Sequence, residues 1–226
     1  MISKIYEKRK ETMINEKYKE YLSYVRTYLT EHNGINSPNP LHPFRSRYHH
    51  TIRVLHWCFR LTEEETEIDK EALYIAAIFH DIGYTDRDNE NHAERSCYAF
   101  REYAKKENMS MEFIDKVADM ILYHSDKSRI KKPETSKELV LLMEADLLDE
   151  EGAMGIVWDC MTLGNAHTNS YGNAYHYIME NSNKPEPNPM ITPKAIAYWE
   201  KKKRIAAEFA EELENDLMIE SDYFEF

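Results

Sequence analysis

Glycine and proline are scarce in this sequence, with 6 and 8 copies among 226 residues. So few turn-forming residues, together with plentiful Glu, Lys, Ala, Leu and Met, favour helices over short strands. Hydrophobic residues make up 42% of the chain, which is enough for a folded core and excludes a disordered protein. The length fits one large domain.

Cysteine is also rare. The three copies, Cys58, Cys97 and Cys160, are odd in number and widely spaced, without the spacing of a zinc finger. They are therefore predicted to be reduced, packed thiols. The first residues, MISKIYEKRKETM, lack the apolar core of a signal peptide, and no apolar run is long enough to cross a bilayer. We expect a cytoplasmic protein that does not enter a membrane.

Basic residues are the minority charge. The chain has 29 Lys and Arg against 41 Asp and Glu, for a net charge of −12. A protein this acidic is a poor general nucleic-acid binder, because phosphate backbones require a basic surface. An anionic substrate would need a local cluster of cations or a bound metal ion.

Hydrophobic periodicity predicts a helix in each of seven segments. These are 14–29, 48–62, 69–82, 91–106, 111–124, 137–158 and 193–217. Residues 125–136 are expected to form a basic loop, and about 165–192 a long polar loop. No segment has the pattern of a strand. The prediction is an all-α, single-domain helical bundle that spans residues 1–226.

Several polar residues lie on the apolar faces of these predicted helices, in positions that point inward. They are His50, His80, His92, His124 and Asp146, and Asp81 directly follows His80. One such residue alone is more often a hydrogen-bonded core residue. As a cluster they can satisfy one another through a cation. Imidazole and carboxylate together suit Mn, Fe, Co, Ni or Zn rather than Mg or Ca alone.

The ordered pattern of His50 in HHTIRV, His80-Asp81 in FHDIG and Asp146 in EADLLDEEGAMGI resembles the HD-domain superfamily of metal-dependent phosphohydrolases. The motif core covers about residues 48–158. The predicted helix 193–217 is similar to the last helix of small stand-alone bacterial members. The resemblance implies an HD-type helical bundle in which His50, His80, Asp81 and Asp146 bind one metal ion.

The same resemblance implies roles for two further histidines. His92 and His124 fall where some members of the family bind a second metal ion that Asp81 bridges, while in other members these histidines contact the substrate. Without a second ion, either could protonate the leaving oxygen. His80, Asp81, His92 and His124 are therefore the expected catalytic residues, and Glu94 is a weaker candidate for the same region.

Positive charge near the site points to substrate binding. Arg53 lies one helical turn after His50, and Lys127 and Arg129 follow His124. These three are predicted to bind phosphate, although a solvated basic loop is the simpler explanation for Lys127 and Arg129. Arg45 and Arg47, which precede His50, are weaker candidates for the same role. The remaining histidines are expected to lie outside the site: His32, His42, His49, His56, His167 and His176.

The function expected from these features is hydrolysis of a small phosphate ester or nucleotide by attack of a metal-bound hydroxide. Two alternatives remain open. One is a di-iron oxygenase with the same fold, and the other is a nucleotide-binding regulatory module without turnover. The sequence does not identify the substrate, the native metal or the oligomeric state.

Overall fold

The fold is known from a computed structural model, which describes residues 16–37, 39, 42–85, 90–165 and 170–218. Within these ranges the only β-type pairing is an isolated bridge between Asn36 and Ser46. None of the helices in the described part of the chain is both long and apolar enough to span a membrane. The predicted all-α fold is confirmed.

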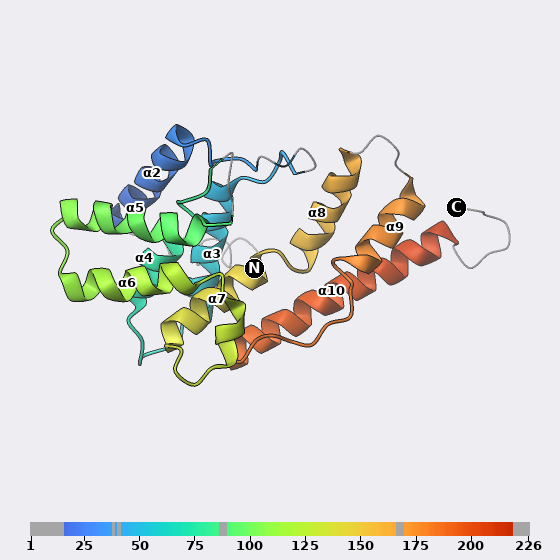
Figure 1. Ribbon diagram of the computed structural model, residues 1–226. Helices are drawn as coiled ribbons and strands as arrows, with labels where there is room; N and C mark the ends of the chain where they lie inside the picture. Colours follow the sequence, from blue (N-terminus) through green and yellow to red (C-terminus); the bar gives the residue numbers. More distant parts are fainter. Residues whose placement is uncertain (1–15, 38, 40–41, 86–89, 166–169, 219–226) are drawn as a thin grey trace.

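Figure 1 shows the order of the helices, which pack into one bundle with an extension formed by the last three. The helices are α2 (Glu16–Glu31), α3 (Arg47–Leu61), α4 (Lys70–Phe79), α5 (His92–Lys106), α6 (Met111–Tyr123), the short 3-10 helix η1 (Lys127–Lys131), α7 (Lys137–Asp149), α8 (Ala153–Gly164), α9 (Tyr171–Glu180) and α10 (Pro193–Leu217). In the bundle, α4 contacts α2, α3, α5, α6 and α7.

Helix α4 is central because its residues are apolar on nearly every side. Asp69 caps its first turn by accepting a hydrogen bond from the Ala72 amide. The helix ends at Phe79, three residues before the predicted end at Ile82. The chain turns there because the Gly83 amide donates to the Ser96 hydroxyl of α5, so the residues between Phe79 and Gly83 lie at the centre of the bundle.

Three boundaries in the second half of the chain differ from the predictions. The segment 137–158 is two helices, because the chain breaks at Gly152, whose φ of +65° is in the left-handed region. The predicted loop 165–192 contains α9, which begins where Ser170 accepts a hydrogen bond from the Asn173 amide. The basic loop contains η1. His167 lies outside the described residues.

Helix α10 joins the extension to the bundle (Figure 1). Its start is anchored by Glu144 of α7, which is fully buried and accepts hydrogen bonds from the Ile191 and Thr192 amides at 2.7 and 2.9 Å. Farther along, Ala206 of α10 packs with Ile156 of α8 and Ile178 of α9 in a small second core. One helix therefore contributes to both cores.

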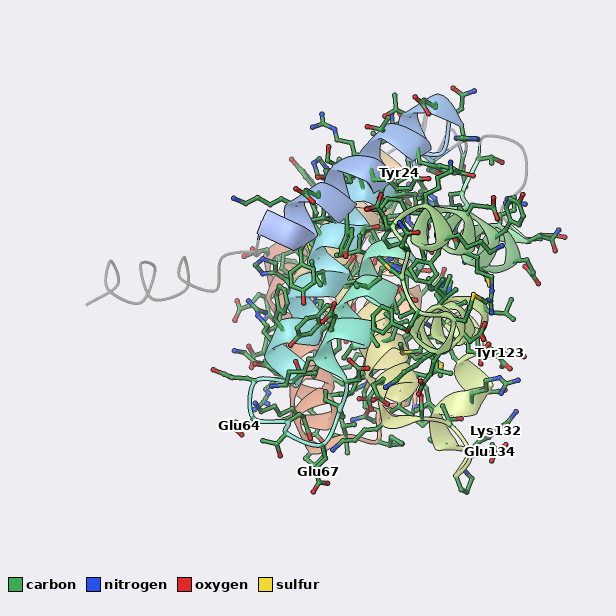
Figure 2. The ribbon with its side chains drawn as sticks, turned by 90° about the vertical axis from the view of Figure 1, so that its left-hand side faces the viewer. Tyr24, Glu64, Glu67, Tyr123, Lys132 and Glu134 are labelled. Carbon is green, nitrogen blue, oxygen red and sulfur yellow. The ribbon has the colours of Figure 1, made fainter. Side chains whose placement is uncertain are left out.

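The surface of the bundle carries the excess charge. Figure 2 shows Glu64 and Glu67 at one turn, and Lys132 and Glu134 at the turn that precedes α7, and all four side chains are exposed. All three cysteines are free thiols, as predicted. Cys58 is buried, as the prediction of packed thiols requires. The prediction is wrong for Cys160, whose side chain is exposed on α8.

Replacing Gly83 with alanine is expected to destabilise the fold. A Cβ at this position would lie 2.4 Å from both the His92 carbonyl oxygen and the Ser96 amide nitrogen, so the start of α5 would have to move. Overpacking of this kind costs about 1–3 kcal/mol, which lowers the midpoint of thermal unfolding by roughly 2–12 °C for a chain of this length. Circular dichroism melting measures the change.

The matched control is Gly164→Ala at the end of α8, where an added Cβ meets no atom within 4 Å. This variant is expected to unfold at or slightly above the wild-type temperature, because alanine favours helix more than glycine does. Equal melting temperatures for the two variants would show that the turn after α4 tolerates a side chain.

Candidate metal centre

The ends of three helices bring together the first set of polar residues from the sequence pattern. His50 Nε2 of α3 lies 3.3 Å from His80 Nε2, 3.1 Å from Asp146 Oδ1 of α7 and 3.5 Å from Asp81 Oδ2. His80 Nε2 lies 3.6 Å from the same Asp81 oxygen. Ligand atoms about 2.1 Å from one ion are roughly 3.0–3.4 Å apart in octahedral or tetrahedral geometry. The distances from His50 to His80 and Asp146 fall in that range, whereas the distances to Asp81 Oδ2 are slightly longer and His80 Nε2 lies 4.0 Å from Asp146 Oδ1.

Hydrogen bonds fix the orientation of these imidazoles. The Nδ1 atom of His80 lies 2.7 Å from the Ala77 carbonyl oxygen, and that of His124 lies 2.6 Å from the Ile121 carbonyl oxygen. A carbonyl oxygen only accepts, so each Nδ1 carries a proton and Nε2 of the neutral ring presents a lone pair. His50 Nδ1 likewise donates to Asp149 Oδ2 at 2.8 Å. The Nε2 atoms of His50 and His80 therefore face each other at 3.3 Å, and a bound cation would take the place of a proton between them.

The electrostatics of this point also favour positive charge. Burial lowers the pKa of His50, but hydrogen bonds with Asp146 and Asp149 outweigh it and raise that pKa to about 10. Burial lowers the pKa of His80 to about 4. Burial also raises the pKa of Asp81, yet the neighbouring histidines and the Arg47 guanidinium hold it well below the usual range. Without an ion, a protonated His50 therefore supplies the positive charge beside the ionised Asp81 and Asp146. A divalent ion would take over that role, with release of the His50 Nε2 proton.

A second set of donors lies on the other side of Asp81. His92 Nε2 of α5 and His124 Nε2, just after α6, are 3.3 Å apart. They lie 3.6 and 3.4 Å from Asp81 Oδ1, whereas Asp81 Oδ2 faces His50 and His80. Each carboxylate oxygen of Asp81 therefore faces a different pair of histidines. Two triads, His50–His80–Asp146 and His80–Asp81–His124, have ligand atoms within 4.8 Å of one another.

Two further residues support this centre: Asp149, which the sequence analysis missed, and Arg47, which it considered only as a weaker candidate for phosphate binding. Asp149 is 1% exposed and, besides His50, accepts two hydrogen bonds from Arg53, at 2.7 and 2.8 Å. Arg47 donates to Asp81 Oδ2 at 3.2 Å and lies over the ring of Tyr84, 3.5 Å from its centroid. The signal for both was helical spacing, because Asp149 follows Asp146 by three residues and Arg47 precedes His50 by three.

The three residues predicted to bind substrate occupy different environments. Lys127 Nζ lies 2.5 Å from Asp146 Oδ2, so this ammonium is at the edge of the centre. Arg53 lies behind the centre, paired with Asp149. Arg129 contacts Asp126 and covers the ring of Tyr123. Of the three cations, the structure brings Lys127 alone into contact with one of the converging side chains.

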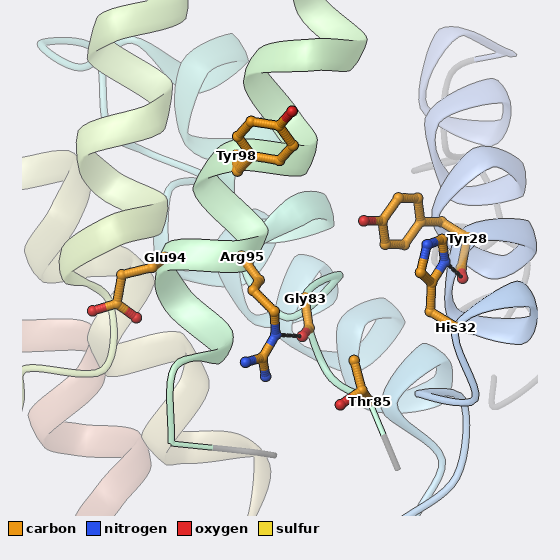
Figure 3. Close-up of a pocket in the computed structure, with 7 residues that line it drawn as sticks. All are labelled: Tyr28, His32, Gly83, Thr85, Glu94, Arg95 and Tyr98. Carbon is orange, nitrogen blue, oxygen red and sulfur yellow. Dashed lines mark hydrogen bonds between the residues drawn. The ribbon is translucent and has the colours of Figure 1, made fainter. Parts of the chain in front are cut away.

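Glu94 lies beside a different cavity, of about 340 Å³, between α2 and α5. Figure 3 shows Tyr28 and His32 on one side of this cavity, whereas the Glu94 carboxylate points to the opposite side. Arg95 binds the Gly83 carbonyl oxygen at 2.8 Å and forms part of the same lining. The cavity thus borders the turn after α4 at Gly83, but none of the histidines of the metal centre lines it.

Asp149→Asn is expected to weaken binding of Mn²⁺ about 10–100-fold, measured by competition with a fluorescent chelator. The amide removes the charge that orients the Nδ1 proton of His50, and such supporting contacts contribute this much to metal affinity. Asp159→Asn is the control, since Asp159 is also buried and accepts hydrogen bonds from Ser182 in the extension. Equal affinities for the two variants would contradict a role for Asp149 in holding His50.

Comparisons with known proteins identify a matching family model and several similar structures. Residues 47–151 match a family model described as the HD domain. No curated protein sequence matches the chain. A structure described as a predicted HD superfamily hydrolase from an uncultured Thermotogales bacterium is similar, with a TM-score of 0.59 and 21% identity over 88% of this chain and 92% of the other.

Bacillus subtilis YpgQ is similar in the same way. Its structure has a TM-score of 0.60 and 20% identity, and the match covers 88% of this chain and 94% of YpgQ. A second structure of YpgQ, in complex with ADP, has the same TM-score and identity. Likeness at this level of identity establishes a shared fold.

Proposed function

We propose that the chain is a metal-dependent phosphohydrolase that cleaves a small phosphate ester or nucleotide, and the match of residues 47–151 to the HD-domain family model supports this proposal. The observation that carries the proposal is the convergence of the Nε2 atoms of His50 and His80 with carboxylate oxygens of Asp81 and Asp146. In the proposal these four residues hold one divalent transition metal ion, and His92 and His124 hold a second ion with Asp81 between the two.

The chemistry follows from where the side chains lie. A divalent ion at this centre would lower the pKa of a water molecule toward neutrality and offset negative charge that develops on the phosphoryl group. Asp81 and Asp146 would hold that ion, and Asp149 keeps the His50 proton on Nδ1. Lys127 can exchange its contact with Asp146 for a phosphoryl oxygen, because its ammonium is at the edge of the centre.

His92 has a separate part in this proposal. Its side chain is 12% exposed, whereas that of His124 is 2% exposed, so His92 is the more accessible of the pair. If a single ion binds, His92 is placed to donate a proton to the leaving oxygen. The ADP complex of YpgQ supports a nucleotide as the first substrate class to test.

One alternative reaction has a specific observation in its favour. Six donor residues arranged about a shared Asp81 also suit two iron ions, which is the arrangement that an oxygenase of this fold would need. Oxygen consumption by iron-loaded protein, with oxidation of a carbon substrate, would identify that activity. If phosphate is released in the absence of oxygen, oxygenase activity is excluded as the source of that phosphate.

The test of the main proposal is a substrate panel. Protein loaded in turn with Mn²⁺, Co²⁺ or Ni²⁺ is incubated with nucleoside mono-, di- and triphosphates and with phosphomonoesters, and phosphate and pyrophosphate are measured. At least one member is expected to be hydrolysed in a metal-dependent manner. Tight nucleotide binding with no product from any member would instead support a regulatory module.

A further inference from the structure

A separate cavity of about 330 Å³ lies on the outer face of α3, next to α8 and α10. We call it the α3–α10 cavity. Its lining includes the indole of Trp57 and four nitrogen-bearing side chains: Arg53, His56 and Arg60 of α3, and Lys202 of α10. His56 was expected to lie outside the metal centre, and it does so here on the same helical face as the two arginines.

Two of these cations lack a carboxylate partner. The Arg60 guanidinium lies over Trp57, 4.8 Å from the ring centroid, and it forms no ion pair with any residue that the structure describes. Lys202 Nζ lies 4.9 Å from the same indole and donates a hydrogen bond to the Glu151 backbone carbonyl at 2.8 Å. These two cations therefore give this cavity positive charge in a chain whose net charge is −12.

The environment of Lys202 shows that this arrangement has a cost. Burial lowers the pKa of Lys202, and the nearby Arg60 and Arg53 lower it further, while Asp149 and Glu151 act in the opposite direction. An anion in the cavity would lie beside two positive charges that repel each other and would offset that repulsion. Trp57 holds both cations at one edge of the cavity through its ring face.

The cavity is distinct from the metal centre although the two are neighbours. Asp149 forms the boundary, and its carboxylate is already bound by Arg53 and His50. Asp149 and His50 are 1% and 2% exposed, so they separate the cavity from the converging Nε2 atoms. A ligand in the cavity therefore meets Arg60, Lys202 and His56 without touching the proposed metal ligands.

We propose that the α3–α10 cavity is a second anion site, which binds a phosphate-bearing small molecule through Arg60 and Lys202. Two cations at one edge suit a ligand with at least two negative charges, because each ammonium or guanidinium group can form a charge-assisted hydrogen bond with a phosphate oxygen. Burial and the neighbouring Arg60 lower the pKa of His56, so its imidazole is neutral at pH 7.5 and can still donate one hydrogen bond.

Calorimetric titration of the full chain with inorganic pyrophosphate tests this site. A chelator is present throughout, so that the result does not depend on the metal centre or on turnover. The double variant Arg60→Ala/Lys202→Ala is expected to raise Kd at least about tenfold, because two charge-assisted contacts are lost. The control is Lys201→Ala/Arg204→Ala, which removes the same charge from exposed positions of α10 outside the cavity lining, and its Kd should match the wild type.

Two more variants keep the result interpretable. Arg60→Gln alone, at an exposed position, preserves the fold and should weaken binding in the same direction. Lys127→Ala, at the edge of the metal centre, should leave pyrophosphate binding unchanged. The proposal is overturned if pyrophosphate does not bind, if both double variants weaken it equally, or if Lys127→Ala alone weakens it. The first two outcomes leave the proposed hydrolase untouched, whereas weaker binding in Lys127→Ala would place pyrophosphate at the metal centre and so overturn the second site alone.

Discussion

Asp81→Ala is expected to abolish metal-dependent phosphate release while the helical content stays close to that of the wild type. The reason is that Asp81 faces His50 and His80 with one oxygen and His92 and His124 with the other. Its loss removes a donor from both sets. Since a bound ion contributes several kcal/mol to transition-state stabilisation, the rate should fall at least about 10³-fold. Initial rates on the best panel substrate measure the effect.

His80→Ala should give the same result, because His80 is 0% exposed and its Nε2 atom points to the same centre. Asp159→Ala is the matched control, since it also removes a buried carboxylate, but from α8 in the extension, where Asp159 accepts hydrogen bonds from Ser182. That variant is expected to lose stability and keep its rate per folded molecule. Full activity in both Asp81→Ala and His80→Ala would show that the reaction occurs elsewhere on the protein.

Removing divalent ions is expected to lower the thermal unfolding midpoint of the wild-type protein. An ion that binds only the folded state at 100 times its Kd contributes about 2.7 kcal/mol. For a chain of this length that is a fall of roughly 5–11 °C in Tm on addition of a chelator. Tm falls because the imidazoles and carboxylates of the centre lose the ion that would bind them together in the folded state.

Differential scanning calorimetry with and without Mn²⁺ measures this shift. The Asp81→Ala variant provides the control, because its Tm should respond little to either metal or chelator. A wild-type Tm that is the same under both conditions would contradict a metal ion bound at the centre of the bundle. An equal shift in the wild type and in the variant would indicate that the ion binds at another place.

The helices were largely predictable from the sequence because their apolar faces are regular. Helices α3, α5 and α6 begin and end within about two residues of the predicted positions, and α10 begins at Pro193 as expected. The break between α7 and α8 was missed because Leu, Met and Ala continue on both sides of Gly152. Its left-handed backbone depends on close packing against Lys202, a contact distant in sequence.

The side chains that converge were predictable for a related reason. A histidine or carboxylate on an otherwise apolar helical face is conspicuous, and His50, His80 and His124 are all buried as that pattern implies. Arg47 and Asp149 were less visible, because charged residues next to such a face usually reach solvent. The cations of the α3–α10 cavity could not be foreseen, since Arg60 and Lys202 meet only when α10 packs against the bundle.

The most direct test of the account is a crystal structure of the Mn²⁺-loaded protein with anomalous diffraction data. The account predicts an anomalous peak bounded by the Nε2 atoms of His50 and His80 and by oxygens of Asp81 and Asp146, each about 2.1–2.3 Å from the ion. A second peak between His92 and His124 is expected at higher Mn²⁺ concentration. Ordered side chains with no peak among them, or a peak only at another place on the protein, would contradict it.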